Sequence, residues 1–181
     1  MKKNREIRKE DAEYLIIDAT EQPVRRPKRR RKKYYSGRKR KHTLKIQFIV
    51  SPDGTVRSVS KTYPGKVHDF GIYKEQKKRD RFLGIPKKGD SGCQGIGKYD
   101  AHAEIPFKKP KNGEPTEEQK AYNRDFSRKR IKVENVIREV KTFKILSETY
   151  RNRRRDHGIK TNIIAGIVNM KVEKRNIKQT A

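Results

Sequence analysis

Residues 43–62 read TLKIQFIVSPDGTVRSVSKT, and this stretch decides the predicted fold. From Thr43 to Val50 polar and apolar residues alternate and then become continuously apolar, and Thr55–Thr62 alternates again. Between them, Ser51-Pro52-Asp53-Gly54 consists of residues that tight turns prefer. The pattern therefore predicts an antiparallel β-hairpin.

A third strand is predicted upstream of this hairpin. Residues 13–20 read EYLIIDAT, a short apolar run that is rich in β-branched side chains. Such a run indicates a buried strand. Asp18 would lie at its polar end, where a side chain can face a cleft.

The remainder of the chain favours helices. His68-Asp69 can start a short helix, and the glycine-rich stretch 84–97 leaves room for a short strand near Asp90. Thr116 followed by Glu117-Glu118-Gln119 is a capping-type start for a helix that extends to Leu146, with a break near Ser127. Thr161-Asn162 predicts the cap of a second helix, 163–170, before a polar tail. Strands first and helices later predict a mixed α/β fold with three antiparallel strands at its start, which resembles the RNase H-like fold.

Composition restricts the function. The 181 residues include 50 Lys and Arg against 22 Asp and Glu, a formal net charge of +28, so we expect a polyanionic partner and salt-sensitive binding. The single cysteine, Cys93, excludes an intramolecular disulfide, and no Cys/His cluster has zinc-site spacing. No apolar run has signal-peptide length or approaches the roughly 20 residues that span a bilayer. These features predict an intracellular protein without a membrane anchor.

The densest positive charge follows the first strand, in the segment 21–42. Contact with nucleic-acid phosphates is the preferred role for its cations, although a nuclear-localisation signal has a similar composition. Tyr34 and Tyr35 within it could stack on an unpaired base or pin the loop to the sheet. The candidate DNA-binding cations here are Arg25, Arg26, Lys28, Arg29, Arg30, Arg31, Lys32, Lys33, Arg38, Lys39, Arg40 and Lys41.

Three acidic residues stand out against this background: Asp18, Asp90 in Gly89-Asp90-Ser91-Gly92, and Glu134 in the long predicted helix. Carboxylates in a strongly basic protein would repel a polyanion unless metal ions neutralise them. Two Mg²⁺ ions about 3.5 to 4 Å apart on shared carboxylates can drive phosphodiester displacement. The residue types meet that requirement, but their separations in sequence alone do not show that they meet in space.

The motifs around these acids resemble the catalytic domain of bacterial insertion-sequence DDE transposases, in the group related to Harbinger transposases. The resemblance covers roughly residues 13–170 in the family's order. It is carried by YLIIDATE at 14–21, YSGRKRKHTLK at 35–45, PGKVHD at 64–69, GDSGCQG at 89–95, and RIKVE at 130–134 with Lys141 and Phe143 after it.

The resemblance implies a role for each motif residue. Asp18, Asp90 and Glu134 would be the catalytic metal ligands for two Mg²⁺ ions, with Mn²⁺ able to substitute. Arg130 and Lys141, near one helix face with Glu134, would contact the scissile DNA; a plain surface ion pair is the alternative. His68 and Asp69 would be accessory residues that orient DNA or water, or else only start a helix.

The resemblance also implies DNA cleavage and strand transfer during transposition, in the bacterial cytoplasm at the nucleoid. Transposon ends and target DNA would be the partners. The corresponding organisation is a basic extension at 1–12, an RNase H-like DDE catalytic domain at 13–172 with the basic loop 21–42, and a polar tail at 173–181. Before the first strand there is no room for a helix-turn-helix region, so we expect a homo-oligomer on DNA or a partner that carries one.

Two alternatives remain open at the level of sequence. A truncated, catalytically incompetent transposase fragment could bind DNA and regulate transposition. A structural RNA-binding protein of ribosomal type could also carry this charge, but it would have no reason to gather the three acids.

Overall fold

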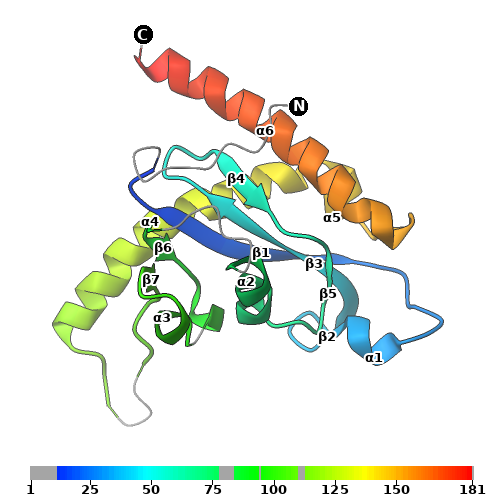
Figure 1. The fold of residues 1–181 in the computed structure, drawn as a ribbon, viewed down its shortest axis with the longest axis horizontal. Helices are drawn as coiled ribbons and strands as arrows, with labels where there is room; N and C mark the ends of the chain where they lie inside the picture. Colours follow the sequence, from blue (N-terminus) through cyan, green and yellow to red (C-terminus); the bar gives the residue numbers. More distant parts are fainter. Residues whose placement is uncertain (1–11, 78–83, 94, 110–112, 181) are drawn as a thin grey trace.

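The computed structural model describes residues 12–77, 84–93, 95–109 and 113–180, and the seven strands found there form one mixed sheet (Figure 1). The strand order is β2-β3-β1-β6-β7, and β4 and β5 also pair with β3. The strands are β1 Leu15–Pro23, β2 Tyr35–Ser36, β3 Lys41–Val50, β4 Val56–Val59, β5 Tyr63–Pro64, β6 Lys87–Lys88 and β7 Ala103–Glu104. The helices are α1 Arg31–Tyr34, α2 Asp69–Lys77, α3 Ile96–Tyr99, α4 Glu117–Lys141, α5 Lys144–Ser147 and α6 His157–Thr180, with 3₁₀ turns at Ser91–Cys93 and Arg154–Asp156.

The predicted hairpin is confirmed, because β3 and β4 pair antiparallel around residues 51–54. β3 also pairs antiparallel with β1, in a continuous register from Ile16 opposite Val50 to Pro23 opposite Thr43. The mixed α/β class and the three antiparallel strands at the start of the fold are therefore confirmed. The first strand extends to Pro23, beyond the expected end near residue 20, because β3 supplies a pairing partner for each added residue.

Two apolar cores cover the two faces of the sheet. On one face α4, α5 and α6 pack against β1, β3 and β4, with Phe48 and Val168 fully buried there. On the other face α2 and α3 pack against alternate residues of β1 and β3, including Ile17 and Ile49. Cys93 is buried in this second core, and burial raises the pKa of its thiol to about 12. Because side chains alternate along a strand, Ile16 and Asp18 share the α4 face.

The long helix α4 begins as predicted and ends earlier. Thr116 and Gln119 form the capping box, each accepting a backbone N–H of the other. The helix passes through Ser127 without a break and stops at Lys141, and the short helix α5 follows. Phe126 and Val133, on either side of the expected break, are buried, so packing holds the chain helical there.

The predicted last helix is present, but its predicted start and end were wrong. α6 spans His157–Thr180, so it includes both the expected cap at Thr161 and most of the expected tail 173–181. Thr161 does not cap, because its hydroxyl donates to the carbonyl of His157 one turn earlier. Beyond Met170 the helix still buries Val172 against the first core, which explains why it continues.

The segment 21–42 is more ordered than a loop. It contains the last residues of β1, the short helix α1 and the strand β2, which pairs with β3. Residues 1–11 of the expected N-terminal extension lie outside the described residues. Within the described part of the chain, no helix is both long and apolar enough to cross a bilayer.

The far end of β1 is fixed by a buried polar cluster. Gln22, which is 4% exposed, donates from Nε2 to the carbonyls of Ile145 (2.8 Å) and Glu148 (2.7 Å). Its Oε1 must therefore accept from Nε2–H of His157 at 2.7 Å, and Nδ1 of His157 is left to accept the Thr62 hydroxyl at 3.0 Å. Burial, assisted by nearby Lys160, lowers the pKa of His157 to about 4.

We predict that His157 makes the fold sensitive to acid. Its stabilising effect is complete above the unfolded pKa of 6.5 and is lost as pH falls towards 4, a change of about 3 kcal/mol. Urea unfolding across this range should therefore show a smaller loss of unfolding free energy for His157→Gln than for the wild type. His68→Gln, at an exposed histidine, is the matched control and should follow the wild type. Parallel curves for wild type and His157→Gln would contradict the prediction.

Candidate active site

Asp18 lies in the middle of β1, not at its end, opposite Phe48 of β3. The side chain is 20% exposed and faces α4, and its Oδ1 accepts the backbone N–H of Ala19 at 2.9 Å. Burial raises the pKa of Asp18 to about 6, with smaller contributions from Asp90 and Asp69, while Arg130 acts in the opposite direction. A nearby cation strongly stabilises the ionised form of such a carboxylate.

That cation is Arg130 of α4, whose guanidinium lies among all three predicted acids. Its Nη1 is 3.4 Å from Asp90 Oδ1, and its Nη2 is 3.8 Å from Asp18 Oδ1 and 3.9 Å from Glu134 Oε1. The fold therefore gathers carboxylates from three separate stretches of sequence around one positive group. Its Nε is buried and has no hydrogen-bond partner among the described residues.

Each acid is positioned by a different element. Asp90 follows β6 and opens the 3₁₀ turn Ser91–Cys93, where its carbonyl accepts the Cys93 N–H at 2.8 Å. β6 lies parallel to β1 with Lys88 opposite Ile16, so Asp90, two residues later, is level with Asp18. Glu134 lies one helical turn after Arg130 on α4 and is 52% exposed, so it forms the solvent side of the group.

The donor set suits a hard divalent cation, because it consists of carboxylate oxygens and already surrounds a positive charge. In the structure the guanidinium of Arg130 lies between these carboxylates. Among the residues that the structure describes, no three His, Cys, Asp or Glu side chains are grouped closely enough to hold a metal ion together. Metal binding would therefore require the guanidinium to withdraw and the carboxylates to close in.

A buried ion network that was not predicted from the sequence lies beneath the site on the α2 face. Lys45 donates from Nζ to Asp69 Oδ1 at 2.8 Å and to the Val67 carbonyl at 2.9 Å, and lies 3.4 Å from Glu21 Oε1. Asp69 is thus an ion-pair partner inside the fold as well as the first residue of α2. Side chains alternate between the two faces along β3, so Lys45 lies on the face opposite Phe48. This alternation is the one sequence signal that could have predicted a buried lysine on the α2 face.

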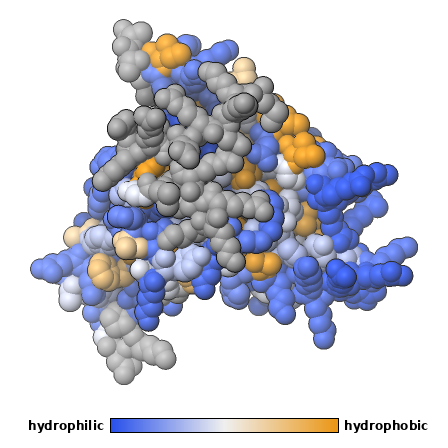
Figure 2. Space-filling model, viewed as in Figure 1, coloured by the Kyte–Doolittle hydropathy of each residue, from blue (hydrophilic) through white to orange (hydrophobic). Residues whose placement is uncertain are grey.

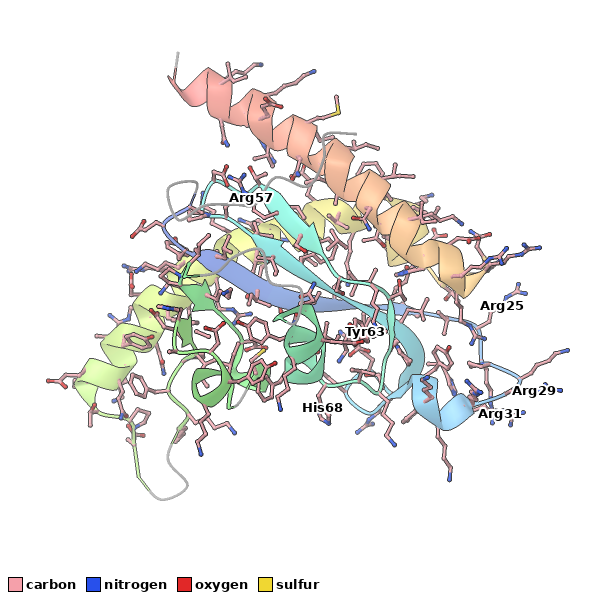
Figure 3. The ribbon with its side chains drawn as sticks, in the orientation of Figure 1. Arg25, Arg29, Arg31, Arg57, Tyr63 and His68 are labelled. Carbon is pink, nitrogen blue, oxygen red and sulfur yellow. The ribbon has the colours of Figure 1, made fainter. Side chains whose placement is uncertain are left out.

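Gly65 allows this network to pack closely. A Cβ atom at this position would lie only 1.9 Å from the hydroxyl oxygen of Thr43, which itself donates to Glu21 Oε2 at 2.6 Å. His68, by contrast, is exposed at the start of α2 and projects away from the sheet (Figure 3).

Lys141 lies further along α4, beside the strand that carries Asp18. Its Nζ is 3.5 Å from the carbonyl oxygen of Glu21. Burial and nearby Lys39 lower the pKa of Lys141, while Asp18 and Glu21 act in the opposite direction. Lys39 of the basic segment therefore approaches the same edge of the site.

The other predicted cations of the segment 21–42 are all exposed at the α1 end of the sheet. Arg25, Arg29 and Arg31 extend outward from it (Figure 3), and no carboxylate pairs with any of these cations in the described part of the chain. Tyr34 packs against the small cluster of Val24, Leu44 and Tyr150, which favours the pinning role. Tyr35 is 45% exposed and meets His42 edge to face.

Comparisons with known proteins place the chain in a family. The family model of the DDE superfamily endonucleases matches residues 17–170. A probable transposase for insertion sequence element IS702 from Microchaete diplosiphon is 41% identical over 155 residues, which cover 86% of this chain and 56% of that relative. The chain thus spans little more than half the length of the relative.

No solved structure matches the chain significantly. The matched range 17–170 includes Asp18, Asp90, Arg130 and Glu134, and these residues meet around one guanidinium. The chain therefore belongs to the DDE superfamily of endonucleases.

Proposed function

We propose that this chain is the catalytic domain of a DNA transposase, in which Asp18, Asp90 and Glu134 bind divalent metal ions. The observation that carries the proposal is the convergence of these three carboxylates on Arg130. A structural RNA-binding protein would have no use for that arrangement. We further propose an RNase H-like fold, which the central position of β1 between antiparallel β3 and parallel β6 supports.

Two Mg²⁺ ions bound there would activate the attacking water or 3′ hydroxyl and stabilise the leaving oxygen of the phosphodiester. The residues of the chain prepare the site for this. Asp18 is held in a poorly solvated position where the ionised form needs a counter-charge. Arg130 supplies that charge until metal arrives, and is then available for a DNA phosphate beside the reacting bond. Lys141 and Lys39 would hold the next stretch of backbone.

Transposon ends and target DNA would be the substrates, and a homo-oligomer or a helix-turn-helix partner would supply the recognition of the ends. These parts of the proposal rest on the DDE family and on the transposase relative, whose length the chain covers only in part. We place the reaction in the bacterial cytoplasm at the nucleoid, where DNA is accessible.

Removing either of two proposed metal ligands should stop cleavage but not DNA binding. Asp18→Asn and Glu134→Gln keep the side-chain shape and remove the charge that holds the metal. We expect Mg²⁺-dependent nicking of a plasmid that carries the encoding segment with its flanking DNA to fall by more than the roughly 100-fold typical of outer-shell losses. Electrophoretic mobility shifts in EDTA should remain within about threefold of the wild type, because the basic surfaces are unchanged.

Two matched variants control for the loss of charge alone. Glu118→Gln and Asp125→Asn remove exposed carboxylates elsewhere on α4 and should nick at the wild-type rate. Undiminished nicking by Asp18→Asn and Glu134→Gln would remove these acids from the mechanism. A wild type that binds DNA but never nicks it with Mg²⁺ or Mn²⁺ would instead favour the binding-only fragment.

Metal binding should depend on pH through Asp18. Below about pH 6 the Asp18 carboxyl is protonated, so Mg²⁺ must displace a proton and its affinity should fall by up to about tenfold per pH unit. Above that value this dependence disappears. Carboxyl ¹³C NMR should show Asp18 titrating near 6 without metal and at lower pH with saturating Mg²⁺.

Arg130→Gln provides the complementary test. Removal of the guanidinium should raise the pKa of Asp18 above its wild-type value, since Arg130 is the strongest influence that lowers it. Equal Mg²⁺ affinity on both sides of pH 6, or a pKa of Asp18 that does not respond to Mg²⁺, would contradict the assignment of Asp18 as a ligand.

A further inference from the structure

A second arginine cluster, which the sequence motifs did not reveal, lies just before α6. Residues 151–155 read RNRRR, and all five are exposed. In the described part of the chain the acid nearest to these arginines is Asp156, which lies 3.5 Å from Arg155. The cluster therefore keeps most of its positive charge available for a partner.

This cluster is fixed to the end of β1. The N–H of Tyr150 donates to the carbonyl of Pro23 at 2.8 Å, and Val24 and Tyr150 form a parallel bridge. The ring of Tyr150 is buried against Val24 and meets His157 edge to face at 4.8 Å. The segment that carries the arginines is thus held from both ends.

This arginine cluster lies next to the basic segment 21–42, and together they form one surface. The guanidinium of Arg154 lies 4.5 Å from the ring centre of Tyr34 in α1. Figure 2 shows hydrophilic side chains over the α1 end of the molecule. We call this the arginine surface, and it comprises Arg25, Arg29, Arg31, Arg151, Arg153, Arg154 and Arg155.

The strand β1 sets the distance from the arginine surface to the site. At about 3.3 Å per residue, Glu21 lies about 10 Å from Asp18, and Val24 about 20 Å from it. The same spacing is found on α4. Lys141, which lies beside Glu21, is seven residues after Glu134, and at about 1.5 Å per residue this is about 10 Å along the helix. The main chain beside Lys141 therefore lies about 10 Å from the site, and the main chain from which the arginine surface extends lies about 20 Å from it.

We infer that the arginine surface binds the phosphate backbone of double-stranded DNA about six base pairs from the bond that is cut. The figure of about six base pairs is the distance of about 20 Å along β1 divided by the rise of 3.4 Å per base pair. The inference rests on the proposed transposase function. Lys39 and Lys141 would contact the intervening backbone, about three base pairs from the cut.

Duplex DNA fits this surface better than a single strand. Proteins that hold single strands use open aromatic rings on which bases stack. Here the Tyr34 ring is covered by Arg154, and Tyr150 is 5% exposed, so neither offers a free face. Tyr35 is 45% exposed, but its ring meets His42 edge to face, and one ring does not form a series on which successive bases could stack. What remains is a set of guanidinium groups on a fixed support, which suits regularly spaced phosphates.

The test measures DNA binding without cleavage. The triple variant Arg151→Gln, Arg153→Gln, Arg155→Gln is compared with Lys171→Gln, Lys174→Gln, Lys178→Gln, which removes the same charge from the exposed far half of α6. Affinity for a mixed-sequence DNA duplex is measured by fluorescence anisotropy in EDTA over a range of NaCl. The arginine variant should reduce the slope of log K against log salt by about 2 to 3, and the lysine variant by less than about 1.

At physiological salt the arginine variant should lose affinity on the order of 100-fold. Equal slopes for the two triple variants would overturn the inference, even if the site cleaves DNA as proposed. A loss confined to an RNA duplex of the same sequence would also overturn it. Because EDTA removes divalent ions, failure of the catalytic proposal leaves this measurement unaffected.

Phosphate-ethylation interference then places the contacts along the DNA. On a duplex that the wild type nicks, interference is expected about three and about six nucleotides from the nick. The arginine variant should lose only the outer set, and loss of the inner set alone would contradict the assignment.

Discussion

The structure depends on the continuous antiparallel pairing of β1 with β3. Side chains alternate along a paired strand, so this register puts Ile16, Asp18 and Gln22 on the face that α4 and α6 cover. A slip of one residue would move Asp18 to the face that α2 covers, away from Arg130. It would also move Ile17 and Glu21 to the face that α4 and α6 cover. The core, the carboxylate site and the anchored end of the strand are thus set by one hydrogen-bonding register.

The charge of Arg130 resolves a conflict that this register creates. Asp18 is poorly solvated and other carboxylates lie nearby, so its ionised form would be unfavourable without a cation within the fold. An arginine on the same helix as Glu134 supplies it and links three distant segments. The same charge balance holds these acids together beside the central strand of the sheet.

Sequence reasoning succeeded where short-range rules decide the structure. Alternation and the Ser-Pro-Asp-Gly turn predicted the hairpin, and Thr116 with Gln119 predicted the start of α4. It failed where distant packing decides. Thr161 looked like a cap, but its hydroxyl is satisfied within a longer helix that Val172 helps to hold on the core.

The candidate site shows the same division. Family motifs predicted Asp18, Asp90, Glu134 and Arg130 as site residues, but pattern alone could not show that one guanidinium would meet all three acids. Lys45 was missed because its ion pairs with Glu21 and Asp69 join residues far apart in the chain. The arginines before α6 were missed because contacts between residues far apart in sequence, such as the bridge between Val24 and Tyr150, bring them to the first strand.

The buried thiol of Cys93 has a practical consequence. Covered by the second core and with a strongly raised pKa, it carries almost no thiolate at neutral pH, and maleimides or oxidants should leave it untouched. Cysteine is otherwise absent from the sequence. A cysteine introduced at an exposed position would therefore accept a single fluorophore or spin label, and the native protein needs no prior removal of thiols.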